Sequence, residues 1–387
     1  MKVEQIYQII NDVTSEVLGK TGLIQEDLQG IVEVGEEIFN QNAVENYTKA
    51  LVDHIGRMVF VNRVYQGTAP SVLMDSWEYG SVLEKVQADT PEATENETWE
   101  LNDGQSYDQN IFYKPSVSVK FFNNAVTFEV PISITDKQVR SAFSTPEQLN
   151  SFMSMILNAV DRSLTIKVNS LVKRTINNFI GETIFNDGLN ATPESKSGVR
   201  AINLLYLYKQ TPQGSKTTLT AENCIYDKEF IRFACYMIKL TCQHLTEMSS
   251  LYNIGGKDRF TPRDLMHIVL LENFASGAEI YLQSDTFHND LVKLPKAETV
   301  QFWQGSGTDF SFANCSTINV TTSEGNSINQ SGVLGVVFDR DALGVNNYKR
   351  YATSNRNNKA EFTNYWYKMF ARYFNDFNEN FIVFLVA

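Results

Sequence analysis

The apolar positions near the start of the chain recur at the spacing of a helix. Between residues 2 and 63 they fall mostly three or four positions apart, which places them on one helical face. Glycines interrupt this pattern at Gly19, Gly22, Gly30 and Gly35. The pattern therefore predicts several short helices, which we interpret as an N-terminal helical arm over residues 1–65.

A polar, acidic segment separates this region from strand-like sequence. Residues 65–113 are rich in carboxylates and in residues that favour turns. The sequences VSVKFF (117–122) and AVTFEV (125–130) then have the character of β-strands. Asn123-Asn124 between them can adopt the positive φ that a tight hairpin requires. We therefore expect a long β-hairpin arm over residues 66–140 that leaves the main body.

The clearest predicted element is a long helix. Thr145, Pro146 and Gln148 supply an N-cap hydroxyl, a proline at the first helical position and a capping-box glutamine. One apolar stripe follows at steps of about three or four, and its members include Phe152, Ile156, Val160, Leu164 and Val168. We expect Gly181 to end the helix, which then covers residues 146–180 and measures on the order of 50 Å. A single stripe on such a rod implies one face packed against a sheet.

The remaining sequence mixes helical and strand patterns, which predicts an α+β fold. The pattern predicts helices at 226–248 and 274–281 and strands at 266–271 and 333–338. The aromatic stretch 362–374 has helical spacing and is interpreted as packing or subunit contact rather than a surface for stacking nucleobases. The final run 381–386 is apolar without alternation, as in strands covered on both faces. Its candidate core residues are Phe381, Val383 and Leu385.

Composition narrows the class of protein. Hydrophobic residues make up 43% of the 387 residues and charged residues 20%, which excludes a wholly disordered chain. The 25 Phe and 17 Tyr favour large buried contacts or interfaces. A net charge of -12 argues against a broad basic surface that binds nucleic-acid phosphates. We expect a soluble protein that is not exported, because apolar runs fall short of the ~20 residues of a membrane helix and Glu4 and Asp12 interrupt the first apolar pattern.

Residues that could carry catalysis or metal binding are present, but none completes a known site. Cys235, Cys242 and His244 lie on one predicted helix without sharing a face, so we interpret the cysteines as core residues rather than zinc ligands. The four cysteines are unevenly spaced and do not form a disulfide framework. His267 lies in a predicted strand, and no G-x-S-x-G motif marks a nucleophile. We predict no catalytic residue, no cofactor and no metal.

The acidic loop 89–108 is the strongest remaining candidate for a ligand site. Its carboxylates include Glu92, Glu95, Glu97, Glu100 and Asp103, but they lack the regular register of a calcium loop. A solvated loop face is the favoured interpretation. A ligand-binding or hydrolase domain that uses this loop stays open as an alternative.

The order of these parts resembles the major capsid protein of tailed bacteriophages, in particular of a small short-tailed phage. The resemblance lies in VSVKFFNNAVTFEVPISITDKQ leading into TPEQLNSFMSMILNAVDRSL, and in GVLGVVFDRDALGV followed by the aromatic C-terminal stretch ending NENFIVFLVA. Herpesvirus capsids and encapsulins use the same fold. The resemblance implies an N-terminal arm (1–65), an extended arm or E-loop (66–140), a peripheral domain with the spine helix (141–225 and 345–387) and an axial domain (226–344).

The resemblance also implies a function and partners. The chain would self-assemble into pentamers and hexamers of an icosahedral shell in the virion, built in the host cytoplasm, that encloses double-stranded DNA without sequence-specific binding. A scaffolding protein, a portal and head accessory proteins would be further partners, and no membrane would be involved. Candidate inter-subunit contacts in the arm are Trp99, Leu101, Tyr107, Phe112 and Tyr113. An encapsulin-type nanocompartment is the main alternative.

Overall fold

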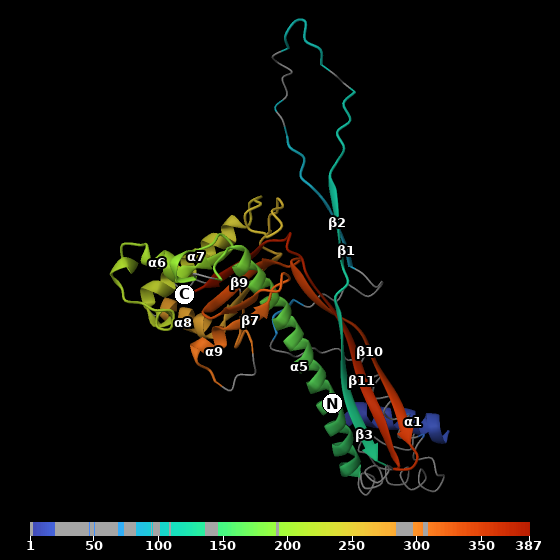
Figure 1. Cartoon of the computed structure of the whole chain (residues 1–387). Helices are drawn as coiled ribbons and strands as arrows, with labels where there is room; N and C mark the ends of the chain where they lie inside the picture. Colours follow the sequence, from blue (N-terminus) through green and yellow to red (C-terminus); the bar gives the residue numbers. More distant parts are fainter. Residues whose placement is uncertain are drawn as a thin grey trace. The chain divides into compact units, whose positions relative to one another are not determined.

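The computed structural model is a mixed helix and sheet structure (Figure 1). It describes residues 3–19, 46, 50, 69–72, 83–93, 95, 101–107, 110–135, 146–190, 193–283, 297–304 and 309–387. Most of the predicted N-terminal arm, the N-cap Thr145 and the arm residue Trp99 lie outside these ranges.

The longer helices of the described residues are α1 (Val3–Leu18), α5 (Pro146–Asn186), α6 (Leu204–Lys209), α7 (Lys228–His244), α8 (Glu272–Gln283) and α9 (Phe312–Ser316). The strands are β1 (Leu83–Ala88), β2 (Val117–Phe122), β3 (Ala125–Thr135), β4 (Ala201–Asn203), β5 (Met266–Leu271), β6 (Glu298–Val300), β7 (Ile318–Thr321), β8 (Ser327–Gln330), β9 (Val333–Asp339), β10 (Leu343–Asn357), β11 (Phe362–Asn375) and β12 (Phe381–Leu385). The predicted helices 226–248 and 274–281 and strands 266–271 and 333–338 are therefore confirmed within a few residues.

The chain divides into two compact units, and the first contains a three-stranded sheet. This unit holds α1, β3, α5 up to Leu171, and most of β10 and β11. The strand order is β10-β11-β3, and β3 and β11 pair antiparallel from Phe362 opposite Thr135 to Arg372 opposite Ala125.

The helical interpretation of residues 362–374 is wrong, because these residues form β11. Alternate side chains of this strand are buried, among them Tyr365, Tyr367, Met369 and Ala371. This period of two is the signature of a strand with one covered face. Aromatic residues crowd both faces of β11, so apolar pairs also occur at helical spacing and gave the wrong period.

The second unit is built on a five-stranded mixed sheet with the order β4-β12-β9-β5-β6. The pairs β12/β9 and β5/β9 are antiparallel, whereas β12/β4 and β5/β6 are parallel. Every residue of β9 and of β12 is buried. This confirms the expectation that the apolar terminal run is a strand covered on both faces.

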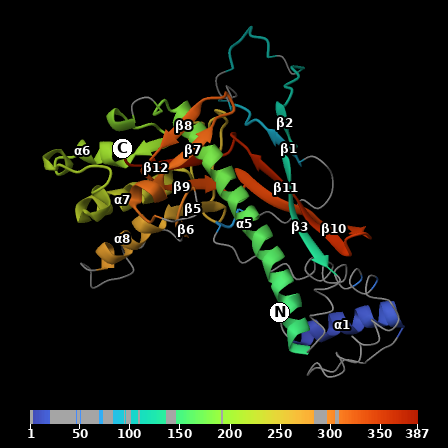
Figure 2. The ribbon, with the colours of Figure 1, turned by 60° about the horizontal axis from the view of Figure 1, so that its bottom comes forward.

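Helices cover the two faces of this sheet. Ile382, Phe384 and Val386 belong to one apolar cluster with buried residues of α6, α7 and α8. Figure 2 shows these three helices near β12. On the opposite face the Phe381 ring stacks on Phe179 of α5, with centroids 4.0 Å apart and planes 10° from parallel. The C-terminal strand is therefore enclosed between α5 and the three shorter helices.

The position of β12 bears on the expected division into domains, which stays a prediction. The resemblance assigned residues 345–387 to one domain and 226–344 to another, yet β12 pairs with β9 and shares a sheet with β5. An apolar run carries no local signal for which buried strand it will join, so the sequence alone could not assign its sheet.

The expected hairpin through Asn123-Asn124 is also wrong. The strands on either side do not pair with each other, because β2 pairs with β1 and β3 pairs with β11. The backbone N–H of Tyr373 donates to the carbonyl oxygen of Asn124 at 3.1 Å. The chain therefore passes from one sheet to another at this point, and the hairpin arm is formed by β1 and β2 instead.

The long helix continues beyond the predicted stop at Gly181 and ends at Asn186. Gly181 is needed for close packing, because a Cβ there would lie 2.3 Å from the Cγ2 atom of Val320 in β7. The stop is at Gly188, where φ is +65°. The N–H groups of Gly188 and Leu189 donate to the carbonyls of Phe185 and Ile184, the hydrogen-bond pattern of a Schellman motif.

We expect Phe381→Ala to lower the free energy of unfolding by about 3–5 kcal/mol, because it leaves a cavity where the buried ring packs against Phe179 of α5. Denaturant titration of the purified protein measures this change. Phe112→Ala is the control: this side chain is 83% exposed, so the change should stay within about 0.5 kcal/mol. Similar losses in the two variants would contradict the placement of β12 in the core.

Two helical glycines should respond in opposite directions to alanine. Helix propensity alone favours alanine at both positions by about 1 kcal/mol. At Gly277 of α8 a Cβ finds ordinary contacts at 3.6 Å and 3.8 Å, so Gly277→Ala should stabilise the protein. At Gly181 the clash with Val320 should make Gly181→Ala destabilising by about 1–3 kcal/mol. Stabilisation of both variants in thermal unfolding would show that α5 and β7 are not in close contact.

Candidate functional site

The hairpin arm begins as a two-stranded ribbon whose apolar face points away from the protein. β1 and β2 pair antiparallel from Leu83 opposite Phe122 to Ala88 opposite Val117. The half-buried face of the ribbon carries mainly polar side chains, Lys85, Gln87, Ser118 and Lys120, together with Leu83 and Phe122. The exposed face carries Glu84 and Ala88 together with the large apolar side chains of Val86, Val117, Val119 and Phe121. This is the reverse of an ordinary amphipathic ribbon on a core.

A carboxylate in the turn between β11 and β12 holds both strands of the ribbon. The Nζ atom of Lys85 lies 3.1 Å from Oδ2 of Asp376, and Nζ of Lys120 lies 3.2 Å from Oδ1. The Asp376 side chain is 0% exposed. Beside this ion pair, the ring of Phe122 packs on Phe374 at a centroid distance of 5.3 Å.

Further charged contacts extend this network along β1. Gln87 donates to Oε1 of Glu379 at 2.8 Å, and Nε of Arg259 lies 3.6 Å from the other Glu379 oxygen. Burial raises the pKa of Glu379, and nearby Lys85 and Arg259 oppose this rise. Where β1 ends, Lys257 lies 2.7 Å from Asp89. Hydrogen bonds from Lys257 and Ser116 lower the pKa of the Asp89 carboxyl.

Sequence reasoning missed this network. Part of it could have been found from the alternation of side chains along the two strands. This alternation places Lys85 and Gln87 on one face of β1 and Lys120 on the corresponding face of β2. The partner Asp376 lies more than 250 positions further along the chain, so no local spacing could connect them.

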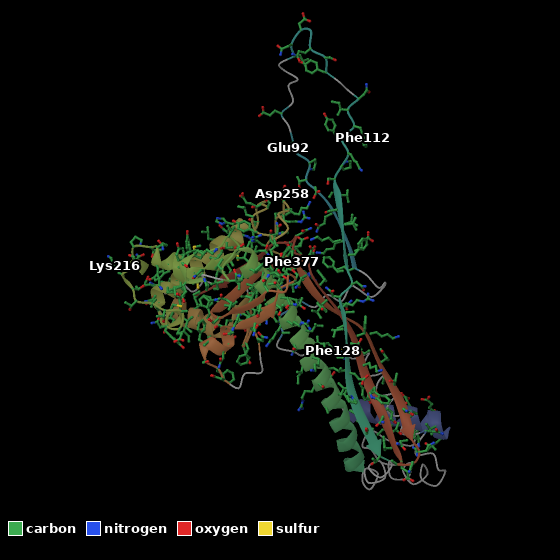
Figure 3. All side chains as sticks on the ribbon, viewed as in Figure 1. Glu92, Phe112, Phe128, Lys216, Asp258 and Phe377 are labelled. Carbon is green, nitrogen blue, oxygen red and sulfur yellow. The ribbon has the colours of Figure 1, made fainter. Side chains whose placement is uncertain are left out.

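Beyond the ribbon, the loop exposes large apolar side chains next to carboxylates. Of the five arm residues predicted to make inter-subunit contacts, four are described, and all four are exposed: Leu101, Tyr107, Phe112 and Tyr113. Phe112 and Tyr113 are 83% and 81% exposed. Figure 3 shows Glu92 and Phe112 on the two sides of this loop. Whether they contact another copy stays a prediction at this point.

The residues predicted to pack the spine and core are partly described. Val160, Leu164 and Val168 of α5 are buried, as are Phe381, Val383 and Leu385 of β12. Phe152 and Ile156 belong to α5, but their side chains lie outside the described part of the structure.

The other candidates for chemistry occupy structural positions. All four cysteines are free and buried. His267 is half-buried, with its ring stacked on Phe338 at 5.7 Å, and burial lowers its pKa. Among the described residues, no group of three or more His, Cys, Asp or Glu side chains is arranged to hold a metal ion.

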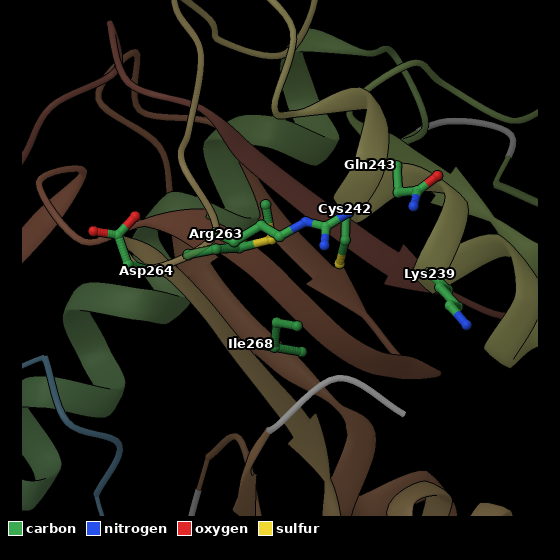
Figure 4. A pocket seen from close by; sticks show the side chains of 7 residues that line it. Lys239, Cys242, Gln243, Arg263, Asp264 and Ile268 are labelled. Atoms are coloured by element: carbon green, nitrogen blue, oxygen red, sulfur yellow. The ribbon is translucent and has the colours of Figure 1, made fainter. Parts of the chain in front are cut away.

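One cavity of about 440 Å³ opens between α7 and the segment that leads into β5 (Figure 4). Its lining includes Cys242, Met266 and Ile268 together with the charged side chains of Lys239 and Arg263. No helix in the described ranges is both long and apolar enough to span a membrane.

Comparison with known proteins identifies the family. The sequence pattern of the family described as Phi29-like phage major capsid protein matches residues 9–385, almost the whole chain. The chain belongs to this family. The resemblance to phage major capsid proteins is therefore confirmed, and neither the encapsulin nor the ligand-binding alternative is favoured.

Individual relatives of this chain are distant in sequence. The major capsid protein of Bacillus phage B103 is 21% identical over 224 residues, which cover 55% of this chain and 49% of the relative. That of Bacillus phage GA-1 is 21% identical over 187 residues, which cover 47% of this chain and 38% of the relative. The chain thus spans about half the length, or less, of these curated relatives.

A solved structure shares the fold. The capsid structure of Staphylococcus phage Andhra superposes with a TM-score of 0.51 and 11% identity, over 84% of this chain and 87% of that chain. At this identity the likeness shows the fold alone, and it confirms an α+β phage capsid fold.

We expect the thiols to resist labelling in the native protein. Burial raises the pKa of Cys224 and Cys235 to about 12 and that of Cys242 to about 11. In the unfolded chain thiols ionise near pH 8.5, so the unfolded state loses these protons first. The thiols' contribution to stability therefore falls as the pH rises above about 8.

A disulfide reagent at pH 8 should label the cysteines rapidly in denaturant and at least tenfold more slowly without it. Equal rates would show that they are not buried.

Proposed function

We propose that this protein is the major capsid subunit of a tailed phage, which self-assembles as pentamers and hexamers into an icosahedral shell around double-stranded DNA. The family match over residues 9–385 is the observation that carries this proposal. The net charge of -12 suits a shell wall that encloses DNA without binding its sequence. The protein acts in the virion after assembly in the host cytoplasm, through contacts between subunits rather than through catalysis.

The domain assignment is part of the proposal, with one revision. Residues 66–140 contain the extended arm, and α5 is the spine helix of a peripheral domain that also uses β3, β10 and β11. Residues 226–344 form the axial domain, to which we add β12 because it pairs with β9. A scaffolding protein, a portal and head accessory proteins are the further partners that a shell of this kind requires.

In this proposal the arm binds a neighbouring copy of the chain. The exposed face of the ribbon and the loop beyond it present apolar side chains that a lone subunit leaves in water. Each large apolar side chain contributes about 1.5–3 kcal/mol when it is fully buried. Covering several of them offsets the entropy lost when the loop becomes ordered against a partner.

The first test is the size of the purified protein. Size-exclusion chromatography with light scattering should detect large assemblies, and negative-stain electron microscopy should show closed shells or five- and six-fold rings. A compact monomer at high concentration, with and without co-expressed head proteins, would contradict the proposal.

We expect the double variant Phe112→Ser and Tyr113→Ser to abolish or strongly reduce shell formation, because it removes two of the most exposed aromatic anchors of the arm. Its unfolding free energy should stay within about 0.5 kcal/mol of the parent value, since neither side chain is packed in the subunit. The control is Lys216→Ser and Ser215→Ala, a second exposed pair on a short 3₁₀ helix remote in sequence. Normal shells from the aromatic variant would exclude these residues as essential contacts.

A further inference from the structure

The turn between β11 and β12 is a rigid base for the ribbon. Its backbone is tied to neighbouring segments at several points: Asp376 N–H donates to Ala342 at 2.7 Å, and Asn380 accepts from Asp339 at 3.0 Å. The carbonyl of Phe377 accepts from Gly255 at 2.8 Å. Asn378 N–H donates to Oδ1 of Asp376 at 3.2 Å, which orients the carboxylate. A side chain on this turn therefore has a fixed position relative to the five-stranded sheet.

The ribbon has a charge conflict that it cannot resolve alone. Lys85 and Lys120 are direct cross-strand partners in the β1-β2 register, and both belong to its half-buried face. Like charges placed directly opposite each other destabilise an antiparallel pair. A two-stranded hairpin is in any case marginal on its own in water. The ribbon therefore needs an anion between these two ammonium groups.

We propose that Asp376 is the positioning residue of the arm: its two carboxylate oxygens clamp Lys85 and Lys120, and this clamp sets the direction in which the arm leaves the subunit. One oxygen faces each strand, at 3.1 Å and 3.2 Å. Lys85 also donates to the backbone carbonyl of Asp341 at 2.5 Å, so its ammonium is held from two sides. Because Asp376 contacts both strands, it fixes the orientation of the ribbon. A contact with one strand alone would leave the ribbon able to turn about that contact.

Neighbouring groups support the clamp without replacing it. On β1, Gln87 donates to Glu379 and Nζ of Lys85 lies 3.9 Å from the same carboxylate, while Phe122 of β2 packs on Phe374 at the base of the ribbon. Each of these contacts engages one strand. Among the described residues, Asp376 is the carboxylate that the structure pairs with both strands at once.

The proposal concerns the free subunit and rests on the proposed function only for what the positioned arm then binds. Asp376→Asn keeps the shape of the side chain and removes its charge. Hydrogen–deuterium exchange of the unassembled protein should show at least tenfold faster exchange in residues 83–88 and 117–122. Exchange in β9 and β12 should stay unchanged. Glu229→Gln, which breaks the exposed pair with Arg232 on α7, is the matched control and should change neither region.

A second variant keeps the test valid if Asp376→Asn fails to fold, because the combined variant should then recover folding. Lys120 is 38% exposed, so Lys120→Met removes one ammonium with little risk to the core. It should relieve the cross-strand repulsion, so that adding it to Asp376→Asn restores part of the lost protection. Unchanged ribbon exchange in Asp376→Asn, parallel loss of protection in β9, or failure of Lys120→Met to restore any protection would each overturn the proposal.

Assembly gives a separate readout. If the parent chain forms shells and Asp376→Asn loosens the ribbon and yields few or misshapen shells, both proposals stand. If the parent chain forms no shells but the ribbon still loosens, the proposed function fails and the positioning role stands. If shells form and the ribbon is unaffected by Asp376→Asn, the positioning role fails and the function stands.

Discussion

The enclosure of β12 is the constraint on which the second unit depends. A strand with every residue buried needs apolar cover on both faces, and here α5 supplies one and α6, α7 and α8 supply the other. Because β12 also pairs with β4 and β9, the last residues of the chain join segments far apart in sequence. Such long-range pairing carries a large loop-closure cost, which the apolar contacts of Phe381 and its neighbours offset.

This enclosure determines where the arm begins. The turn that enters β12 cannot shift without moving a buried strand, so Asp376 and Glu379 are presented at fixed places beside the sheet. The ribbon meets them with its polar face, which leaves Val86, Val119 and Phe121 exposed. A ribbon held by charge on its inner face keeps its apolar face available for contact with another copy of the chain.

The sequence predicted features that depend on local pattern and missed those that depend on distant pairing. Continuous apolar runs predicted the buried strands, and the apolar stripe that follows Pro146 predicted α5. The spacing of apolar residues in 362–374 suggested a helix because aromatic residues occupy both faces of β11. The Asn123-Asn124 turn misled because turn chemistry permits a hairpin without requiring one. Gly181 looked like a helix stop because its packing partner Val320 lies far along the chain.

The candidate site shows the same difference between features set by local pattern and features set by distant pairing. Exposed aromatics in an acidic loop could be singled out by residue type, whereas the Lys85–Asp376–Lys120 arrangement needed the folded turn. The chemistry of that arrangement suits a positioning role better than a stabilising one. Buried ion pairs often give little more stability than apolar residues of the same volume, since desolvation consumes most of the Coulomb energy. They do discriminate strongly between geometries, because a buried carboxylate displaced from its two ammonium partners loses the positive charges that compensate its burial. In the proposed shell, where a small error in arm direction is repeated at every copy, that discrimination matters more than added stability.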